Sequence, residues 1–168
     1  MAEITLKGNK IHTIGEIPPV GANLEDFNFK LTKTDLSDVG LNDFKGKRIV
    51  LNTFVSLDTS VCANSVRRFN KESGSLDNTV ILCISKDLPF AHNRFCTTEG
   101  LENVISLSEM RDSQFSETMG LKITSGPFTG LIARSVIILD ENLKVLHSQL
   151  VPEITNEPDY EKALKVIR

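Results

Sequence analysis

Two apolar runs in the middle of the chain predict buried strands, with a helical pattern between them. Residues 48–54 and Thr79–Ser85 are nearly continuous in aliphatic and other apolar side chains, as expected of strands covered on both faces. Between them, Cys62, Val66 and Phe69 recur at intervals of four and three residues, which places them on one face of a helix. Two buried strands joined by a helix form a right-handed parallel unit.

The remaining pattern extends this unit to a mixed sheet with helices on both faces, an α/β fold. Further strands are expected at 27–31, 104–107, 134–139 and 144–151, a short helical segment at 41–44, and helices at 87–98 (with Asp87 as a candidate cap), at 111–119 and from Pro158 onward. Alternation at 4–7 and 10–13 around Gly8-Asn9 predicts an amino-terminal β-hairpin. The length of 168 residues predicts one domain, 1–168.

The charge balance and the first residues narrow the class of protein. Lys and Arg number 19 and Asp and Glu number 22, a net charge of −3, and no basic run points to nucleic acid as a partner. The first residues are polar, unlike a signal peptide, and no run of about 18 apolar residues that could span a membrane occurs. We therefore expect a cytoplasmic protein without a membrane partner, in a compartment that keeps thiols reduced.

Three cysteines, Cys62, Cys83 and Cys96, are the main candidates for chemistry. They form neither a CxxC motif nor a short Cys/His pair, so we expect no zinc site and no cofactor. Cys83 lies inside the second buried strand, where no turn or helix end would activate its thiol. We therefore interpret Cys83 as a small buried hydrophobic residue.

Cys62 occupies the position that best suits a reactive thiol. It lies in the first turn of the expected helix, after a strand and a polar loop at 55–61. Unpaired N–H groups and the helix dipole favour an anion there, so a thiol tends to become a nucleophilic thiolate; packing in the core is the less favoured alternative. Thr59 can direct its hydroxyl at the same site, cap the helix, or do both, and Arg134 can supply a fixed guanidinium.

Cys96 offers a second thiol near the end of the next expected helix. In a reducing compartment, a thiolate nucleophile together with a second thiol implies a reversible disulfide, although it does not say what the thiolate attacks. His92, four residues before Cys96, shares its helix face. This histidine can either promote ionisation of the thiol or lie in solvent on the surface, and the second interpretation is favoured.

The residues around these thiols resemble the peroxiredoxins. Residues 57–62 (LDTSVC) are similar to the active-site loop of that family. Similarity to its bacterial thiol peroxidase branch, the atypical two-cysteine type, extends over 63–70, 83–91, 94–96, Gly126-Pro127, Ala133-Arg134 and 157–160. The resemblance covers nearly the whole chain and implies a single thioredoxin-like domain, a mixed central sheet flanked by helices, with an amino-terminal hairpin.

The resemblance also implies an activity and roles for four residues. Cys62 would be the peroxidatic cysteine, which reduces hydrogen peroxide and organic hydroperoxides to water and alcohols by way of a sulfenic acid. Cys96 would be the resolving cysteine, forming an intramolecular Cys62–Cys96 disulfide that thioredoxin recycles. Thr59 and Arg134 would activate the thiolate and polarise the peroxide, and the protein would be a homodimer.

One position departs from the family pattern. Val55 stands where the motif has proline. Valine restores a backbone N–H that needs a partner and frees the φ angle, so we expect a less rigid loop and an altered rate. Thr59, Cys62 and Arg134 are all retained, and the expected activity is therefore unchanged in kind.

Two other functions would use the same thiols. A redox-sensing or chaperone-like protein would use the disulfide as a switch, and it would react with peroxide once, whereas an enzyme turns over with catalytic amounts of thioredoxin. A thiol–disulfide oxidoreductase is disfavoured because the chain has no CxxC motif.

Overall fold

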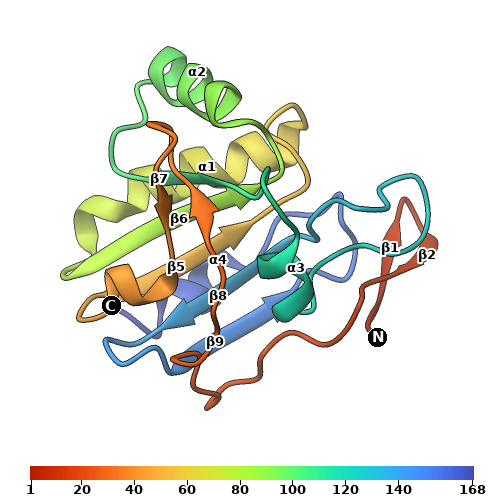
Figure 1. Ribbon diagram of the computed structural model, residues 1–168, viewed down its shortest axis with the longest axis horizontal. Helices are drawn as coiled ribbons and strands as arrows, with labels where there is room; N and C mark the ends of the chain where they lie inside the picture. Colours follow the sequence, from red (N-terminus) through yellow and green to blue (C-terminus); the bar gives the residue numbers. More distant parts are fainter.

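A computed structural model describes residues 1–168 and shows a mixed sheet with helices packed against it (Figure 1). The main sheet has seven strands in the order β4-β3-β7-β6-β5-β8-β9, and β1 and β2 form a separate hairpin. The strands are β1 Glu3–Leu6, β2 Asn9–His12, β3 Leu31–Thr32, β4 Asp38–Val39, β5 Arg48–Thr53, β6 Thr79–Ser85, β7 Ile105–Ser108, β8 Ser135–Leu139 and β9 Val145–Leu150. The helices are η1 Leu41–Phe44, α1 Ser60–Glu72, η2 Ser73–Ser75, α2 Pro89–Glu99, α3 Gln114–Thr118 and α4 Tyr160–Leu164.

The centre of the sheet confirms the predicted parallel unit. β5 pairs in parallel with β6, with Leu51 opposite Leu82, and β6 pairs in parallel with β7. α1 and α2 provide the two crossover connections, and β8 and β9 add antiparallel strands beyond β5. Because β5 and β6 are parallel neighbours, the loops that follow them emerge side by side at one edge of the sheet.

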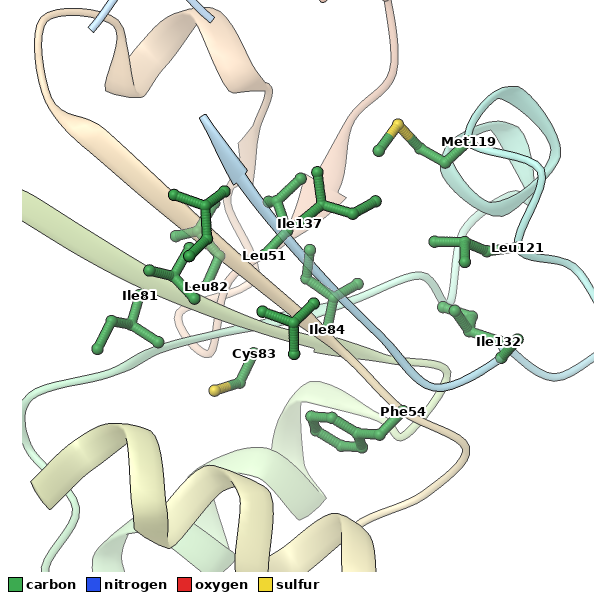
Figure 2. Packing of buried hydrophobic residues seen from close by; sticks show 14 of the residues in the cluster. Leu51, Phe54, Ile81, Leu82, Cys83, Ile84, Met119, Leu121, Ile132 and Ile137 are labelled. Atoms are coloured by element: carbon green, nitrogen blue, oxygen red, sulfur yellow. The ribbon is translucent and has the colours of Figure 1, made fainter. Parts of the chain in front are cut away.

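Helices cover both faces of the sheet, as predicted. Figure 2 shows Cys83 of β6 directed toward α1, whereas Met119 and Leu121, which follow α3, approach from the opposite side. α4 packs on α1, with the rings of Phe69 and Tyr160 in an edge contact at 5.4 Å. None of the helices is both long and apolar enough to cross a membrane.

The amino-terminal hairpin forms, but its turn lies one residue earlier than predicted. Leu6 pairs with Asn9, so the two-residue loop is Lys7-Gly8 rather than Gly8-Asn9. Both loop residues have positive φ angles, 50° and 82°, as a primed hairpin turn requires. Glycine takes the more extreme of these angles without steric cost.

Glu153 fastens this hairpin to the segment that follows β9. Its carboxylate accepts hydrogen bonds from Gly8 N at 2.9 Å and Thr5 Oγ1 at 3.0 Å, and from the backbone N and the hydroxyl of Thr155 at 2.9 and 2.8 Å. These donors, the Thr155 N–H foremost, lower the pKa of the Glu153 carboxyl to about 2. The hairpin is therefore held in place by hydrogen bonds to an ionised group.

The strand predicted at 27–31 is mostly absent. Only Leu31 of this segment enters β3, which pairs with the two residues of β4 and one residue of β7. The Phe27 N–H donates to the carbonyl of Leu24 in a turn, and the ring of Phe29 is buried against Phe115 at 4.9 Å. The alternating pattern therefore reflects burial of two rings in a loop and not a ladder of paired strands.

Two predicted helices begin later than expected, because capping side chains intervene. α3 starts at Gln114, since the carboxylate of Asp112 accepts the Gln114 N–H at 2.9 Å in a turn before the helix. α4 starts at Tyr160, since Asp159 is its N-cap and accepts the Lys162 N–H at 3.0 Å. Pro158 therefore precedes the last helix and does not open it.

Candidate active site

Cys62 lies in the first turn of α1, as predicted, just beyond the carboxyl end of β5. Thr59 is the N-cap residue of α1, with φ and ψ of −103° and 141°, and its carbonyl accepts the Ala63 N–H at 3.0 Å. The side chain of Cys62 is completely buried, with an exposed fraction of 0%. The thiol therefore lies near the first-turn N–H groups and away from bulk water.

The guanidinium of Arg134 lies against the sulfur of Cys62. Its Nη2 donates to Sγ at 3.0 Å, and its Nε donates to the carbonyl of Ile154 at 2.9 Å, which fixes the plane of the group. Arg134 is only 2% exposed, and its Nη1 has no hydrogen-bond partner in the protein. A buried cation at this distance can stabilise a thiolate, and its remaining nitrogen can donate to the oxygen of a bound molecule.

Thr59 caps α1 through its backbone and not through its side chain. Its hydroxyl donates to the carbonyl of Ser56 at 3.1 Å and makes no capping bond to the helix. The side chain lines the same cavity as Arg134, so the structure brings these two predicted site residues together. In this conformation the Thr59 hydroxyl proton is directed to the loop and not to the Cys62 sulfur.

A mostly apolar cavity of about 460 Å³ opens at this site. Its walls are Leu6, Lys7, Val55, Thr59, Ser60, Val61, Phe128, Arg134, Ile154 and Thr155. They come from the hairpin, the Cys62 loop, the 123–131 loop and the segment after β9, which lie far apart in the sequence. The cavity can hold a small molecule that has an apolar part and an oxygen for the guanidinium.

Cys96 lies near the carboxyl end of α2, as predicted, and is half-buried. Its Sγ is 3.3 Å from the Oγ of Ser106 on β7. A separate cleft of about 430 Å³ adjoins it. All three cysteines are free thiols, so Cys62 and Cys96 are in the reduced state, each with a different partner.

Cys83 is a buried packing residue, as predicted. It is 0% exposed, and burial raises the pKa of its thiol to about 12, against a smaller opposing effect of the Asn52 amide at 3.7 Å. The thiol therefore stays protonated and is a poor nucleophile.

His92 is not the solvated surface histidine that we expected. It is 1% exposed, and its Nε2 lies 3.0 Å from the Oγ of Ser85. Burial lowers the pKa of His92 to about 4, so the imidazole is neutral at physiological pH. The helical pattern of α2 is only weakly amphipathic, and the buried side of the helix was therefore hard to recognise from sequence.

Asp87 has a role at this site that the sequence analysis missed. It does not cap α2, whose N-cap residue is Leu88. Its carboxylate instead accepts the Ser56 hydroxyl at 2.9 Å and the Leu57 N–H at 2.8 Å, both from the loop before Cys62. The order of the strands could have indicated this contact. Residues that directly follow two neighbouring parallel strands lie close together at one edge of the sheet.

A mixed sheet of this order, with a buried thiol at the start of the helix that follows the inner strand β5, is that of a thioredoxin-like redox protein. A family model described as Redoxin matches residues 19–164. A thiol peroxidase of Corynebacterium glutamicum is 53% identical over 167 residues, which cover 99% of each chain. The chain therefore belongs to the Redoxin family and, within it, to the bacterial thiol peroxidases of the peroxiredoxin type, and it is a peroxidase enzyme.

Solved structures share this fold over nearly the whole chain. A peroxiredoxin-like protein from Aquifex aeolicus superposes with a TM-score of 0.89 at 34% identity, covering 99% of this chain and 96% of the other. A thiol peroxidase from Chromobacterium violaceum superposes with a TM-score of 0.88 at 23% identity, covering 99% and 95%. The thioredoxin-like fold with a small amino-terminal hairpin is thereby confirmed.

Proposed function

We propose that the protein reduces hydrogen peroxide and organic hydroperoxides with Cys62 as the peroxidatic cysteine. The observation that carries the proposal is the Arg134 guanidinium, which donates one N–H to the buried sulfur at 3.0 Å and keeps Nη1 unpartnered. The positive charge favours the nucleophilic thiolate over the thiol. The unpartnered nitrogen is available to an oxygen of the substrate.

In the first step, the Cys62 thiolate attacks one oxygen of the peroxide. A sulfur–oxygen bond forms and the oxygen–oxygen bond breaks, so the sulfur is oxidised to a sulfenic acid, and the other oxygen leaves, once protonated, as water or an alcohol. Arg134 stabilises the charge that develops on the oxygens, and Thr59 contributes its hydroxyl after turning from the Ser56 carbonyl. Each preorganised donor of this kind is worth about 3 kcal/mol.

In the second step, Cys96 acts as the resolving cysteine of the same chain. Its thiol attacks the sulfenic sulfur of Cys62, water leaves, and an intramolecular disulfide forms. Thioredoxin then reduces this disulfide by thiol–disulfide exchange and is itself oxidised. The half-exposed position of Cys96 supports this assignment, since the sulfur can be freed by a local change at the end of α2.

The cavity beside Cys62 supports organic hydroperoxides as substrates in addition to hydrogen peroxide. Its walls include Leu6, Val55, Val61, Phe128 and Ile154, which can contact an alkyl group while the peroxide oxygens face Arg134. We place the reaction in the cytoplasm, where thioredoxin keeps thiols reduced. We further propose a homodimer, for which the exposed Leu88 and Phe90 at the start of α2 offer apolar contact surface.

Peroxide consumption with catalytic amounts of thioredoxin tests the proposal. The wild-type protein is expected to consume many equivalents, Cys62→Ser none, and Cys83→Ser nearly as many as wild type, because the Cys83 thiol is buried and protonated. Consumption of a single equivalent per chain would favour the redox-sensing or chaperone-like alternative. Equal losses in the Cys62 and Cys83 variants would contradict the assignment of the nucleophile.

A further inference from the structure

Asp87 connects the Cys62 loop, residues 55–59, with the helix that carries Cys96. We propose that Asp87 is a positioning residue that holds this loop in its peroxide-reactive conformation and ties that conformation to the first turn of α2. This inference rests on the proposed function of Cys62 and Cys96, neither of which Asp87 itself contacts.

The loop side of the connection consists of two hydrogen bonds to one carboxylate. Oδ1 of Asp87 accepts from the Ser56 hydroxyl at 2.9 Å, and Oδ2 accepts from the Leu57 N–H at 2.8 Å. The Ser56 Oγ in turn accepts the Asp58 N–H at 3.1 Å. Hydrogen bonds to a charged acceptor are about twice as strong as those between neutral groups, so this carboxylate dominates the local conformation of the loop.

The α2 side of the connection passes through Ser85. The Ser85 hydroxyl donates to Oδ2 of Asp87 at 2.6 Å, and its oxygen lies 3.1 Å from the Asp87 N–H and 3.0 Å from Nε2 of His92. Because the single hydroxyl proton goes to the carboxylate, the oxygen must accept from both nitrogens. The imidazole therefore carries its proton on Nε2, and Nδ1, which has no partner and is buried, is bare.

This arrangement couples the two segments that have to move before a disulfide can form. The loop conformation places Cys62 against Arg134, while the His92 bond fixes the first turn of α2, four residues before Cys96. The Cys62 sulfur lies on Arg134 and the Cys96 sulfur lies beside Ser106, so one or both sulfurs must leave these partners before they can bond to each other. Loss of the bonds to Asp87 releases both segments at once.

Hydrogen exchange and single-turnover kinetics on the full-length protein test the proposal. In Asp87→Ala, exchange at Leu57 and at the Ala91 and His92 amides, which bond to the Leu88 carbonyl, is expected to be about tenfold faster, as loss of a hydrogen bond to a charged group implies. Peroxide reduction by Cys62 should slow by a similar factor, while the subsequent disulfide step is equal or faster. Asp87→Asn, which keeps one acceptor oxygen, should recover part of both effects.

The matched control is Asp77→Asn, in the turn before β6 and outside the Cys62 loop. The Asp77 carboxylate is exposed and makes no hydrogen bond or ion pair, so its variant loses the same charge without losing a contact. Wild-type exchange and kinetics are expected for it. Equal behaviour of the Asp87 and Asp77 variants, or slowing of both chemical steps in Asp87→Ala, would overturn the proposal. The exchange readout needs no peroxide, so a wild-type protein that consumes none would contradict the proposed function separately.

Discussion

The Arg134 guanidinium uses two of its nitrogens to hold its place, one on the Ile154 carbonyl and one on the Cys62 sulfur. The third nitrogen, Nη1, is buried without a partner, a costly state unless a ligand uses it. Lysine could supply the charge at this position but not the planar arrangement of donors. The contribution of Arg134 to the reaction therefore depends on the arrangement of its N–H donors as well as on its positive charge.

Replacement of Arg134 tests whether its N–H donors contribute to the reaction of Cys62 with peroxide. We expect Arg134→Ala to slow the reaction of Cys62 with peroxide by roughly 100-fold or more at neutral pH, as loss of an oxyanion donor does. Arg134→Lys should recover part of the loss. Stopped-flow measurement of a single turnover checks this, and rates within a factor of about two of wild type in both variants would show that Arg134 has no part in the chemistry.

Val55 is a second residue with a testable effect. It is 3% exposed, and its backbone N–H donates no hydrogen bond, so proline at this position would remove no bond. We expect Val55→Pro to raise the free energy of unfolding by about 0.5 kcal/mol, by restricting the unfolded chain, and to slow disulfide formation. Denaturant unfolding and single-turnover kinetics measure the two effects; Val55→Ala, which loses packing but not φ freedom, is the control. A destabilised proline variant would contradict this account.

The hairpin of β1 and β2 belongs to the site although it forms a sheet of its own. Leu6 and Lys7 line the cavity, and the only ionised group that fastens the hairpin turn is Glu153. The pKa of Glu153, lowered to about 2 from an ordinary value of 4.5, means that the folded state prefers the ionised carboxylate. The stability that it contributes is therefore present above about pH 4.5 and is lost as the pH falls toward about 2.

Glu153→Gln should abolish the loss of stability that protonation of Glu153 causes between about pH 4.5 and pH 2. At neutral pH, we expect the variant to exchange the amides of residues 3–12 faster than wild type and to bind organic hydroperoxides less well, with a raised KM and a smaller change for hydrogen peroxide. Hydrogen exchange at two pH values and steady-state kinetics provide the measurements. Glu102→Gln, at an exposed carboxylate without a partner, is the control. Unchanged exchange in the hairpin would contradict the anchoring role.

Apart from the short strands β3 and β4, the strands, crossover helices and hairpin could be predicted from sequence because their signals are local. The apolar runs of β5 and β6 and the helical spacing from Cys62 to Phe69 required no knowledge of distant residues. Capping chemistry moved the starts of α3 and α4, because a carboxylate before each helix takes an early N–H. Such boundaries depend on one side-chain rotamer, which no periodic pattern encodes.

The site was only partly predictable. The position of Cys62 follows from its place after a strand, and the resemblance to peroxiredoxins pointed to Arg134, but the contact between them joins residues 72 apart in the chain. His92 and Asp87 were misinterpreted as a surface histidine and a helix cap because their partners, Ser85 and the 55–59 loop, meet them only in the folded sheet. Neighbouring parallel strands are the feature that brings these residues together.

The molecule as a whole holds its two proposed redox cysteines apart. The sulfur of Cys62 lies on Arg134, and that of Cys96 lies beside Ser106 on β7, at the end of a different helix. Cys62 lies in α1 and Cys96 in α2, and loops at the edge of the sheet join these helices to the strands before them. Neither cysteine lies in a strand of the sheet. Local opening of such segments costs less than global unfolding, so a change between two local conformations is compatible with an intact sheet.

Oxidation by one equivalent of peroxide tests whether the two cysteines come together through local changes in α1 and α2. We expect a Cys62–Cys96 disulfide by non-reducing peptide mapping, with faster hydrogen exchange in the first turn of α1, in the end of α2, or in both. Cys96→Ser should reduce one equivalent and stop as a sulfenic acid, while Cys83→Ser should form the same disulfide as wild type. A Cys62–Cys83 linkage, or a Cys62–Cys96 linkage without any change in exchange, would show the account to be wrong.

The separate hairpin has a consequence for how activity and selectivity are encoded. Of the reacting groups, Cys62 lies in α1 and Arg134 directly precedes β8. Leu6 and Lys7 reach the same cavity from a two-stranded unit that makes no pairing with the main sheet. Side chains of the hairpin can therefore diverge between relatives, or be exchanged by grafting, without disturbing the chemistry. The first dozen residues are the natural place to redesign which hydroperoxide this enzyme prefers.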